Sequence, residues 1–308
     1  MQATPTLSFT NRARSDIARI TTELTDLQRQ TASGKRVEDL QGLGSGATRA
    51  LNATTLIAQD DNRIELLKEV NARVGMQTTS LQLAGEAVSK LAKSVRDAAI
   101  TGDGNYVGPD LEFGFASLTS AMNQTFNGQA IFGGDRTDRT SVTVGNLSDL
   151  TTVSQPDEMF DVSSRRQRID LGPGASFELG DNAKDLTWTT YQAMRDLQVL
   201  LDSAGGKLGA SLTTIQTDAL NSIAERLSQG ATNIRQAEGK NGLIEARIED
   251  LTNRFEARGN MMRNEVALQT EADLAEVALR LSSLQTQYQA TAQTFSQLSK
   301  MTLLDFLR

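Results

Sequence analysis

Apolar residues recur at alternating three- and four-residue steps through the stretch from residue 47 to residue 100, which no proline interrupts. This spacing places one apolar stripe along a helix and is typical of coiled coils. At ~1.5 Å per residue the helix would be about 80 Å long. It needs partners, because its stripe must be buried. Nine of its ten seam positions are apolar, and Gln77 is the exception. The ten positions are Leu67, Val70, Val74, Gln77, Leu81, Ala84, Val88, Leu91, Val95 and Ala98.

The two ends of the chain carry seams of the same kind. A first helix is predicted from about Ser8 to Ala32, and Ser33-Gly34 ends it. Its seam consists of Ala13, Ile17, Ile20, Leu24 and Leu27. The C-terminal seam consists of Leu274, Val277, Leu281, Leu284, Tyr288, Thr291, Phe295 and Leu298, and Leu303, Leu304, Phe306 and Leu307 follow it.

An isolated amphipathic helix is marginal in water, because its apolar stripe has nothing to pack on. The two terminal segments are therefore expected to pack on each other and on other copies of the chain. We expect them to be largely mobile in the soluble monomer and to become ordered on assembly. In the alternative arrangement they close a self-contained bundle within one chain.

The segments between the seams alternate between helices and turns. Gly42, Gly44 and Gly46 predict a plain loop, since they join two helices and lack the Lys-Ser/Thr ending of a phosphate-binding loop. Thr101 to Pro109 is a turn cluster. Further helices are predicted over residues 111–127, 188–204 and 215–237 and, after Gly239, again from residue 243.

The expected fold class is mainly α with a small β-containing insert, in which the N- and C-terminal segments form a long antiparallel coiled-coil or helical rod. Short β-like pieces are predicted at residues 141–144, 169–171 and 176–179. The expected domains are an N-terminal assembly region (1–46), a helical rod domain (47–136 with 186–272), a β-rich insert (137–185) and a C-terminal coiled-coil assembly region (273–308).

Composition argues against most kinds of enzyme. The chain contains no Cys and no His, which removes thiolate nucleophiles, imidazole catalysis and Cys or His metal sites. Asp60 and Asp61 are adjacent on a predicted helix and therefore diverge, so a solvated face is the better interpretation than a pair of catalytic or metal-binding carboxylates. No catalytic, cofactor-binding or metal site is expected, and the protein is predicted not to be an enzyme.

Charge and hydropathy limit the partners. The formal net charge is −7, and no stretch gathers enough Lys and Arg to neutralise a run of phosphates, so neither nucleic acid nor an anionic membrane is an expected partner. Residues 1–30 show no cationic segment followed by an apolar run, which argues against a cleaved secretory signal. No window reaches the ~20 apolar residues of a membrane-spanning helix.

Two segments of the chain, residues 27–37 (LQRQTASGKRV) and residues 126–137 (FNGQAIFGGDRT), resemble segments of the flagellin family. The first looks like the segment that follows that family's first helix, and the second is similar to the stretch with which its hook-associated members leave the rod domain. The closing helix of the same subgroup is similar to residues 272–281, 285–290 and 301–307. Filament flagellins usually carry an acidic pair and Ala-Ala-Gly where this chain has residues 43–48 (LGSGAT), which favours the hook-associated subgroup.

The resemblance implies an extracellular structural subunit of the bacterial flagellum at the hook–filament junction, exported unfolded without a cleaved signal peptide. The implied partners are copies of the chain, flagellin, another hook-associated protein and a flagellar export chaperone. In this reading the chaperone covers the C-terminal helix at Leu281, Leu284, Phe295, Leu298, Leu303, Leu304 and Phe306. The alternatives are a filament flagellin and, from a different class, a secreted coiled-coil adaptor or effector.

Overall fold

The structure is a computed structural model that describes residues 4–37, 44, 46–153, 156–170 and 176–306, with side chains described at 11–37, 44, 46–153, 157–170 and 176–297. It divides into two compact units. Unit 1 contains Met1–Asp61 and Glu256–Arg308, and unit 2 contains Asn62–Phe255. Two long helices, α2 (Ala47–Thr101) and α6 (Thr214–Thr270), contribute residues to both units.

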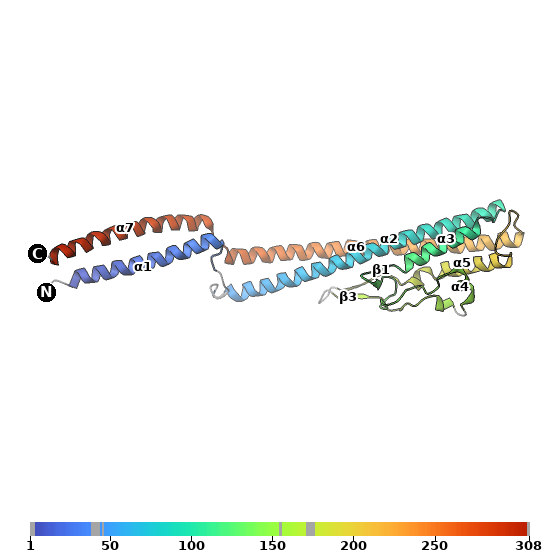
Figure 1. Ribbon diagram of the computed structural model, residues 1–308, viewed down its shortest axis with the longest axis horizontal. Coiled ribbons are helices and arrows are strands. Elements are labelled where there is room, and N and C mark those ends of the chain that lie inside the picture. The colour runs from blue at the N-terminus through green and yellow to red at the C-terminus, as the bar shows by residue number, and fades with distance from the viewer. Residues whose placement is uncertain (1–3, 38–43, 45, 154–155, 171–175, 307–308) are drawn as a thin grey trace. The chain divides into compact units, whose positions relative to one another are not determined.

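Unit 1 pairs the two ends of the chain. Helix α1 (Thr4–Ser33) and helix α7 (Leu274–Phe306) lie side by side, and the residues that follow α1 and precede α7 form an antiparallel bridge at Lys35 and Glu271. Figure 1 shows α1 in blue and α7 in red running in opposite directions, with the N and C ends of the chain at the same end of the pair. The remaining helical residues of unit 1 are the first turns of α2 and the last turns of α6.

In unit 2, α2 and α6 run antiparallel (Figure 1). Their side-chain hydrogen bonds show this direction, because partners later in α2 meet partners earlier in α6. Thr78 donates to Glu245 at 2.9 Å, Ser89 accepts from Arg235 at 2.6 Å, and Arg96 donates to Ser228 at 3.0 Å. All ten seam positions predicted in α2, from Leu67 to Ala98, are buried.

Two shorter helices and an insert complete unit 2. Helix α3 (Val107–Met122) and helix α5 (Ala183–Ser203) pack with α2 and α6 around one hydrophobic core. The chain between α3 and α5, called the insert from here on, begins earlier than the predicted insert of 137–185. It contains the hairpins β1 (Thr125–Phe126) with β2 (Gln129–Ala130) and β3 (Arg168–Asp170) with β4 (Ser176–Glu178), the short helix α4 (Leu147–Thr152) and a 3-10 turn (Pro156–Met159). Both hairpins are two-stranded and antiparallel. The mainly α fold with a small β-containing insert is therefore confirmed.

Three local predictions need correction. Helix α6 continues through Gly239, because its neighbours on both sides supply buried contacts and an exposed glycine costs only ~1 kcal/mol in a helix. The predicted turn cluster is shorter than expected, since Pro109 lies in the first turn of α3, where its missing N–H has no helical partner to lose. Helix α3 ends at Met122 and not near Asn127.

The chain turns back at Asn127-Gly128 instead. Both residues have positive φ angles of 52° and 76°, which is the backbone of a two-residue hairpin turn and sets the pairing of Thr125 with Ala130. The β-like piece at 141–144 is reduced to one bridge between Val142 and Phe160. Helix α4 was not predicted; Asp149 begins it by accepting from the backbone N–H of Asn146 at 2.9 Å. Gly42 and Leu171, which belong to a predicted loop and a predicted strand, lie outside the described residues.

Candidate assembly surface

The contact between α1 and α7 contains the apolar residues that the spacing selected. Ile20 is 1% exposed, and Ala13, Leu27 and Val277 are also buried. The half-buried members are Ile17, Leu24, Leu281, Leu284, Thr291 and Phe295. A stripe on α1 and a stripe on α7 thus meet along unit 1, each supplying side chains that neither helix could bury alone.

The seam of α7 consists of two columns, and α1 covers them unequally. Val277, Leu284 and Thr291 form one column at seven-residue spacing, and these residues are buried or half-buried. In the other column, which also contains Leu281 and Phe295, Leu274 is 52% exposed and Tyr288 is 39% exposed. One helix cannot cover both columns of a coiled-coil stripe, so an apolar strip of α7 stays accessible beside the α1 contact.

Unit 1 exposes further large apolar side chains that the seam analysis did not select. Met261 and Leu268 on α6 are 66% and 81% exposed, and they lie seven residues apart on one helix face. Leu51 on α2 is 52% exposed, and Leu279 on α7 is 74% exposed. The seven-residue spacing of Met261 and Leu268 was a usable signal in the sequence, but the neighbouring polar residues interrupt that stripe.

Backbone hydrogen bonds tie the end of α1 to the junction between α6 and α7. The N–H of Arg36 donates to the carbonyl of Thr270 at 2.8 Å, and the N–H of Ala272 donates to the carbonyl of Gly34 at 3.0 Å. Gly34 has a φ of 68°, a left-handed conformation that ends α1 as Ser33-Gly34 predicted. The two helix breaks are thereby held at the same level, which sets the register of α1 against α7.

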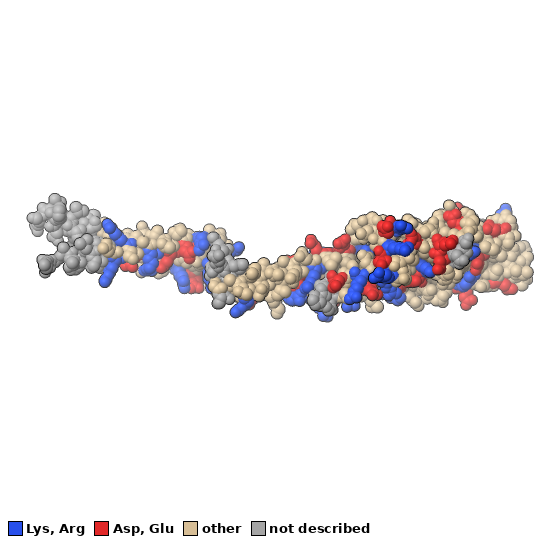
Figure 2. All heavy atoms as spheres, turned by 90° about the horizontal axis from the view of Figure 1, so that it is seen from below, with Lys and Arg blue, Asp and Glu red and all other residues tan. Residues whose placement is uncertain are grey.

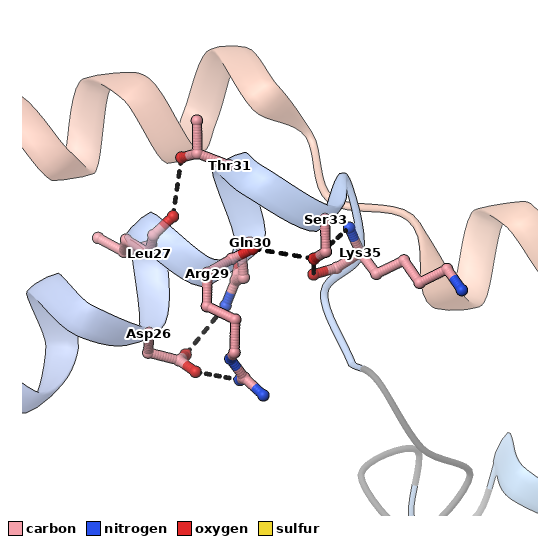
Figure 3. A network of polar contacts seen from close by, with 7 residues as sticks. All are labelled: Asp26, Leu27, Arg29, Gln30, Thr31, Ser33 and Lys35. Carbon is pink, nitrogen blue, oxygen red and sulfur yellow. Dashed lines mark hydrogen bonds and ion pairs between the residues drawn. The ribbon is translucent and has the colours of Figure 1, made fainter.

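Side chains support the end of α1, as Figure 3 shows. Gln30 donates to Asp26 at 3.0 Å, Arg29 pairs with the same carboxylate, and the hydroxyl of Ser33 donates to the carbonyl of Arg29 at 2.9 Å. The N–H of Lys35 donates to the Ser33 hydroxyl at 3.2 Å. The motif Gln-Thr-Ala-Ser-Gly-Lys thus has a structural role here: it closes the helix and begins the β-bridge.

The assignment of Asp60 to a solvated face was wrong. Its side chain is 1% exposed and accepts from Arg258 on α6, with 2.6 Å between Nε and Oδ2. This pairing raises the pKa of the Arg258 guanidinium. Asp61 is half-exposed and pairs with Arg263 at 2.5 Å. Adjacent carboxylates do diverge, as expected, but each one reaches a different arginine on the antiparallel helix.

Within the described residues, no group of three or more acidic side chains could hold a metal ion. None of the helices, over the residues searched, is long and apolar enough to cross a membrane. On the face of unit 2 drawn in Figure 2, acidic and basic side chains are intermixed over the surface.

Four predicted site residues cannot be placed. The side chains of Leu298, Leu303, Leu304 and Phe306 lie outside the part of the chain whose side chains the structure describes. The described seam therefore ends at Phe295 on α7. The roles assigned to all of the seam and chaperone residues remain predictions.

The C-terminal part of the chain is similar to a known protein family. Residues 224–307, which include α7 and most of α6, match the family described as the bacterial flagellin C-terminal helical region. Over these residues the chain is similar to that helical region of flagellins. The flagellin resemblance identified in the sequence is confirmed over these residues.

Two solved structures share the fold. The crystal structure of Bacillus cereus FlgL aligns with a TM-score of 0.50 and 13% identity, covering 65% of this chain and 98% of that one. A protein described as a flagellar hook-associated protein from Vibrio parahaemolyticus aligns with a TM-score of 0.56 and 15% identity, covering 75% and 98%. No curated protein sequence matches the chain. At these identities the two alignments show a shared fold.

Proposed function

We propose that this protein is a structural subunit of the bacterial flagellum that joins the hook, through another hook-associated protein, to the flagellin filament. The proposal rests on two observations taken together. Residues 224–307 match the flagellin C-terminal helical region. The fold is shared with FlgL and with a hook-associated protein, and nearly the full length of each aligns with this chain. The assembled protein would lie outside the cell, and its partners would be copies of itself, flagellin and a hook-associated protein.

The exposed apolar side chains of unit 1 support this role. A subunit that joins two unlike neighbours needs heterologous contacts, with different surface patches facing different partners. Leu274 and Tyr288 on α7, and Met261 and Leu268 on α6, provide two apolar strips on different helices. A fully buried Leu or Met contributes roughly 1.5–3 kcal/mol, so each strip gains free energy when a neighbouring helix covers it.

A filament flagellin is the second candidate, because the flagellin C-terminal match is equally expected of a filament subunit. A polymerisation assay on the purified protein distinguishes the two functions. A filament flagellin polymerises alone into long filaments under filament-forming conditions, whereas a junction subunit adds only to hook ends. Long homopolymers in electron micrographs would contradict the junction proposal.

Electron microscopy of a deletion strain tests the proposal directly. Cells that lack the protein are expected to carry hooks without filaments and to shed flagellin into the medium, and the intact gene on a plasmid should restore filaments. A strain without the protein that still grows filaments of normal length and number would refute the junction role. Immunogold labelling of the complemented strain should mark one short zone between hook and filament.

Export and chaperoning complete the proposal. The subunit would leave the cell unfolded through the flagellar secretion channel, and a chaperone would cover the C-terminal helix until then. The described candidates for this contact are Leu281, Leu284 and Phe295, which are half-buried against α1 in the folded chain. The same apolar side chains cannot pair with α1 and with a chaperone at once, so chaperone binding would hold unit 1 open.

A further inference from the structure

Gln77 interrupts an otherwise apolar seam on α2, and the structure shows what it contacts. The residue is 2% exposed. Its Nε2 donates to the backbone carbonyl of Ile131 at 2.6 Å, directly after the β1–β2 hairpin. One turn earlier on α2, Arg73 donates to the carbonyl of Ala130 at 3.2 Å. Two buried polar side chains of α2 therefore hold adjacent carbonyls at the start of the insert.

The oxygen of the same side-chain amide, Gln77 Oε1, is buried and accepts no hydrogen bond from the described residues. A buried amide oxygen without a partner is costly, because it has lost its hydrogen bonds to bulk water. Such atoms in native proteins usually bind an ordered water molecule or another small donor.

The Gln77 side chain lines a pocket of about 80 Å³ between α2, α6 and the insert. Asn241 of α6, which is 3% exposed, lines it from the opposite side, and Gly180 lies between them. A methyl group added at Gly180 would lie 3.3 Å from Oδ1 of Asn241 and 3.5 Å from Oε1 of Gln77. The two side-chain amides thus converge on one point beside Gly180.

Three of the four charged residues that line the pocket pair with one another: Asp181 accepts a hydrogen bond from Lys240 at 3.0 Å and pairs with Arg166. The fourth, Glu178, is exposed. The buried polar side chains that line the pocket, Gln77 and Asn241, are neutral amides. A cavity needs roughly 10–15 Å³ to hold one buried water, which makes two to four hydrogen bonds, so this pocket has room for several.

We propose that this pocket is a hydration site in which ordered water donates to Gln77 Oε1 and bridges to the Asn241 side chain. The bridge joins α2, α6 and the segment that leaves the insert at Gly180. Together with the direct bond from Gln77 to Ile131, it makes Gln77 a positioning residue that fixes both ends of the insert on the two long helices. A polar residue at one seam position commonly specifies a single arrangement of packed helices.

The substitution Gly180→Ala distinguishes a hydrated pocket from an empty one by the sign of its effect. Its methyl group would displace water from the point between the two amides and leave Gln77 Oε1 without a donor. In the full-length chain we expect the melting temperature to fall by about 3 °C or more. Gly145→Ala is the matched control, because Gly145 is an exposed glycine of the insert whose added Cβ would make only an ordinary contact, 3.8 Å from Oδ2 of Asp149. This substitution should leave the temperature unchanged or slightly raised.

An unchanged or raised melting temperature for Gly180→Ala would overturn the proposal, since displacement of a water that satisfies a buried amide oxygen must cost stability. A double-mutant cycle with Gln77→Met and Asn241→Leu adds a second measurement. A shared water bridge predicts that the double variant loses clearly less stability than the sum of the single losses, and additive losses would count against the bridge.

A high-resolution crystal structure of the full-length chain gives the direct readout. Density for water within hydrogen-bond distance of both Gln77 Oε1 and the Asn241 side chain supports the proposal. A dry pocket, or a protein donor to Gln77 Oε1, refutes it, even if one of the variants fails to fold.

Discussion

The guanidinium of Arg258 on α6 holds both carboxylate oxygens of Asp60 on α2, and the aspartate side chain is almost completely buried while the arginine side chain is 43% exposed. The pair joins the two long helices within unit 1. The two losses are not equivalent: loss of the arginine removes two hydrogen bonds to a buried carboxylate, whereas loss of the aspartate leaves an arginine that water can reach.

Replacement of Arg258 by Ala is therefore expected to destabilise unit 1 by about 2–3 kcal/mol, less than for a fully buried pair because of the partial exposure. Arg263→Ala is the matched control. Its partner Asp61 is 50% exposed, so the loss should stay within ~1 kcal/mol. Denaturant unfolding and amide exchange near residue 60 measure both changes, and equal effects of the two variants would contradict the burial argument.

The close approach of α5 and α6 depends on Gly230. A Cβ at this position would lie 2.1 Å from Oγ1 of the buried Thr190, so Gly230→Ala should cost about 1–3 kcal/mol through overpacking. Gly239 on the same helix has open space around it, and Gly239→Ala should stabilise the chain by ~0.5–1 kcal/mol. Thermal unfolding of the two variants should shift in opposite directions; shifts of the same sign would argue against the clash.

Substitution of Tyr288 should impair assembly without impairing folding. It is 39% exposed beside the α1 contact, so Tyr288→Ala is expected to change monomer stability by less than ~1 kcal/mol. If neighbouring subunits cover the strip, the variant should still be secreted but should restore filaments poorly in a deletion strain. Ile20→Ala is the contrasting variant, since Ile20 is 1% exposed and its truncation should cost roughly 2–4 kcal/mol and loosen the α1–α7 pair in the monomer. Full complementation by Tyr288→Ala would exclude this side chain from the assembly contact.

Asp161 makes the insert sensitive to acid. Hydrogen bonds from Arg136 at 2.5 Å and from Arg139 at 3.3 Å lower the pKa of its carboxyl. A carboxyl with a lowered folded-state pKa adds stability above its unfolded pKa, about 3.9, and loses it as the pH falls through the lower folded value.

The emission of Trp188 reports this change, because it is the one tryptophan of the sequence and its ring centroid lies 6.3 Å from that of Phe160, the neighbour of Asp161. Between pH 5 and pH 2 the wild-type emission should change more steeply than that of Asp161→Asn. Identical acid titrations of the two proteins would show that the hydrogen bonds from Arg136 and Arg139 to Asp161 contribute nothing to the stability of the insert in this pH range.

The chaperone contact predicts a simple truncation result. A chain that ends at Ala272 lacks α7 and should lose affinity for its export chaperone in a pull-down or calorimetric titration. A chain that lacks α1 but keeps α7 should bind at least as well as the full chain, because α1 competes for the same stripe. Retained binding by the first truncation would place the chaperone site elsewhere.

The sequence by itself determined the long helices and their buried faces. The strict spacing from Leu67 to Ala98 predicts which side of α2 is buried, because helical geometry places those residues on one stripe whatever their partners are. The pairing of α1 with α7 follows for a similar reason, since two apolar stripes at the ends of a chain have little else to pack on. Ser33-Gly34 also predicts its helix end correctly, because only a left-handed residue closes α1 there.

Only the tertiary structure decided what the polar residues on those helices do. The sequence predicts that Asp60 is solvated, but the fold brings it into contact with Arg258, 198 residues away. In the sequence Gln77 is an unexplained polar residue in an apolar seam, and the fold shows that it binds the backbone carbonyl of Ile131. Helical periodicity is local and can be read along the chain, whereas the partner of a buried charge or amide comes from a distant segment whose position depends on the whole packed fold.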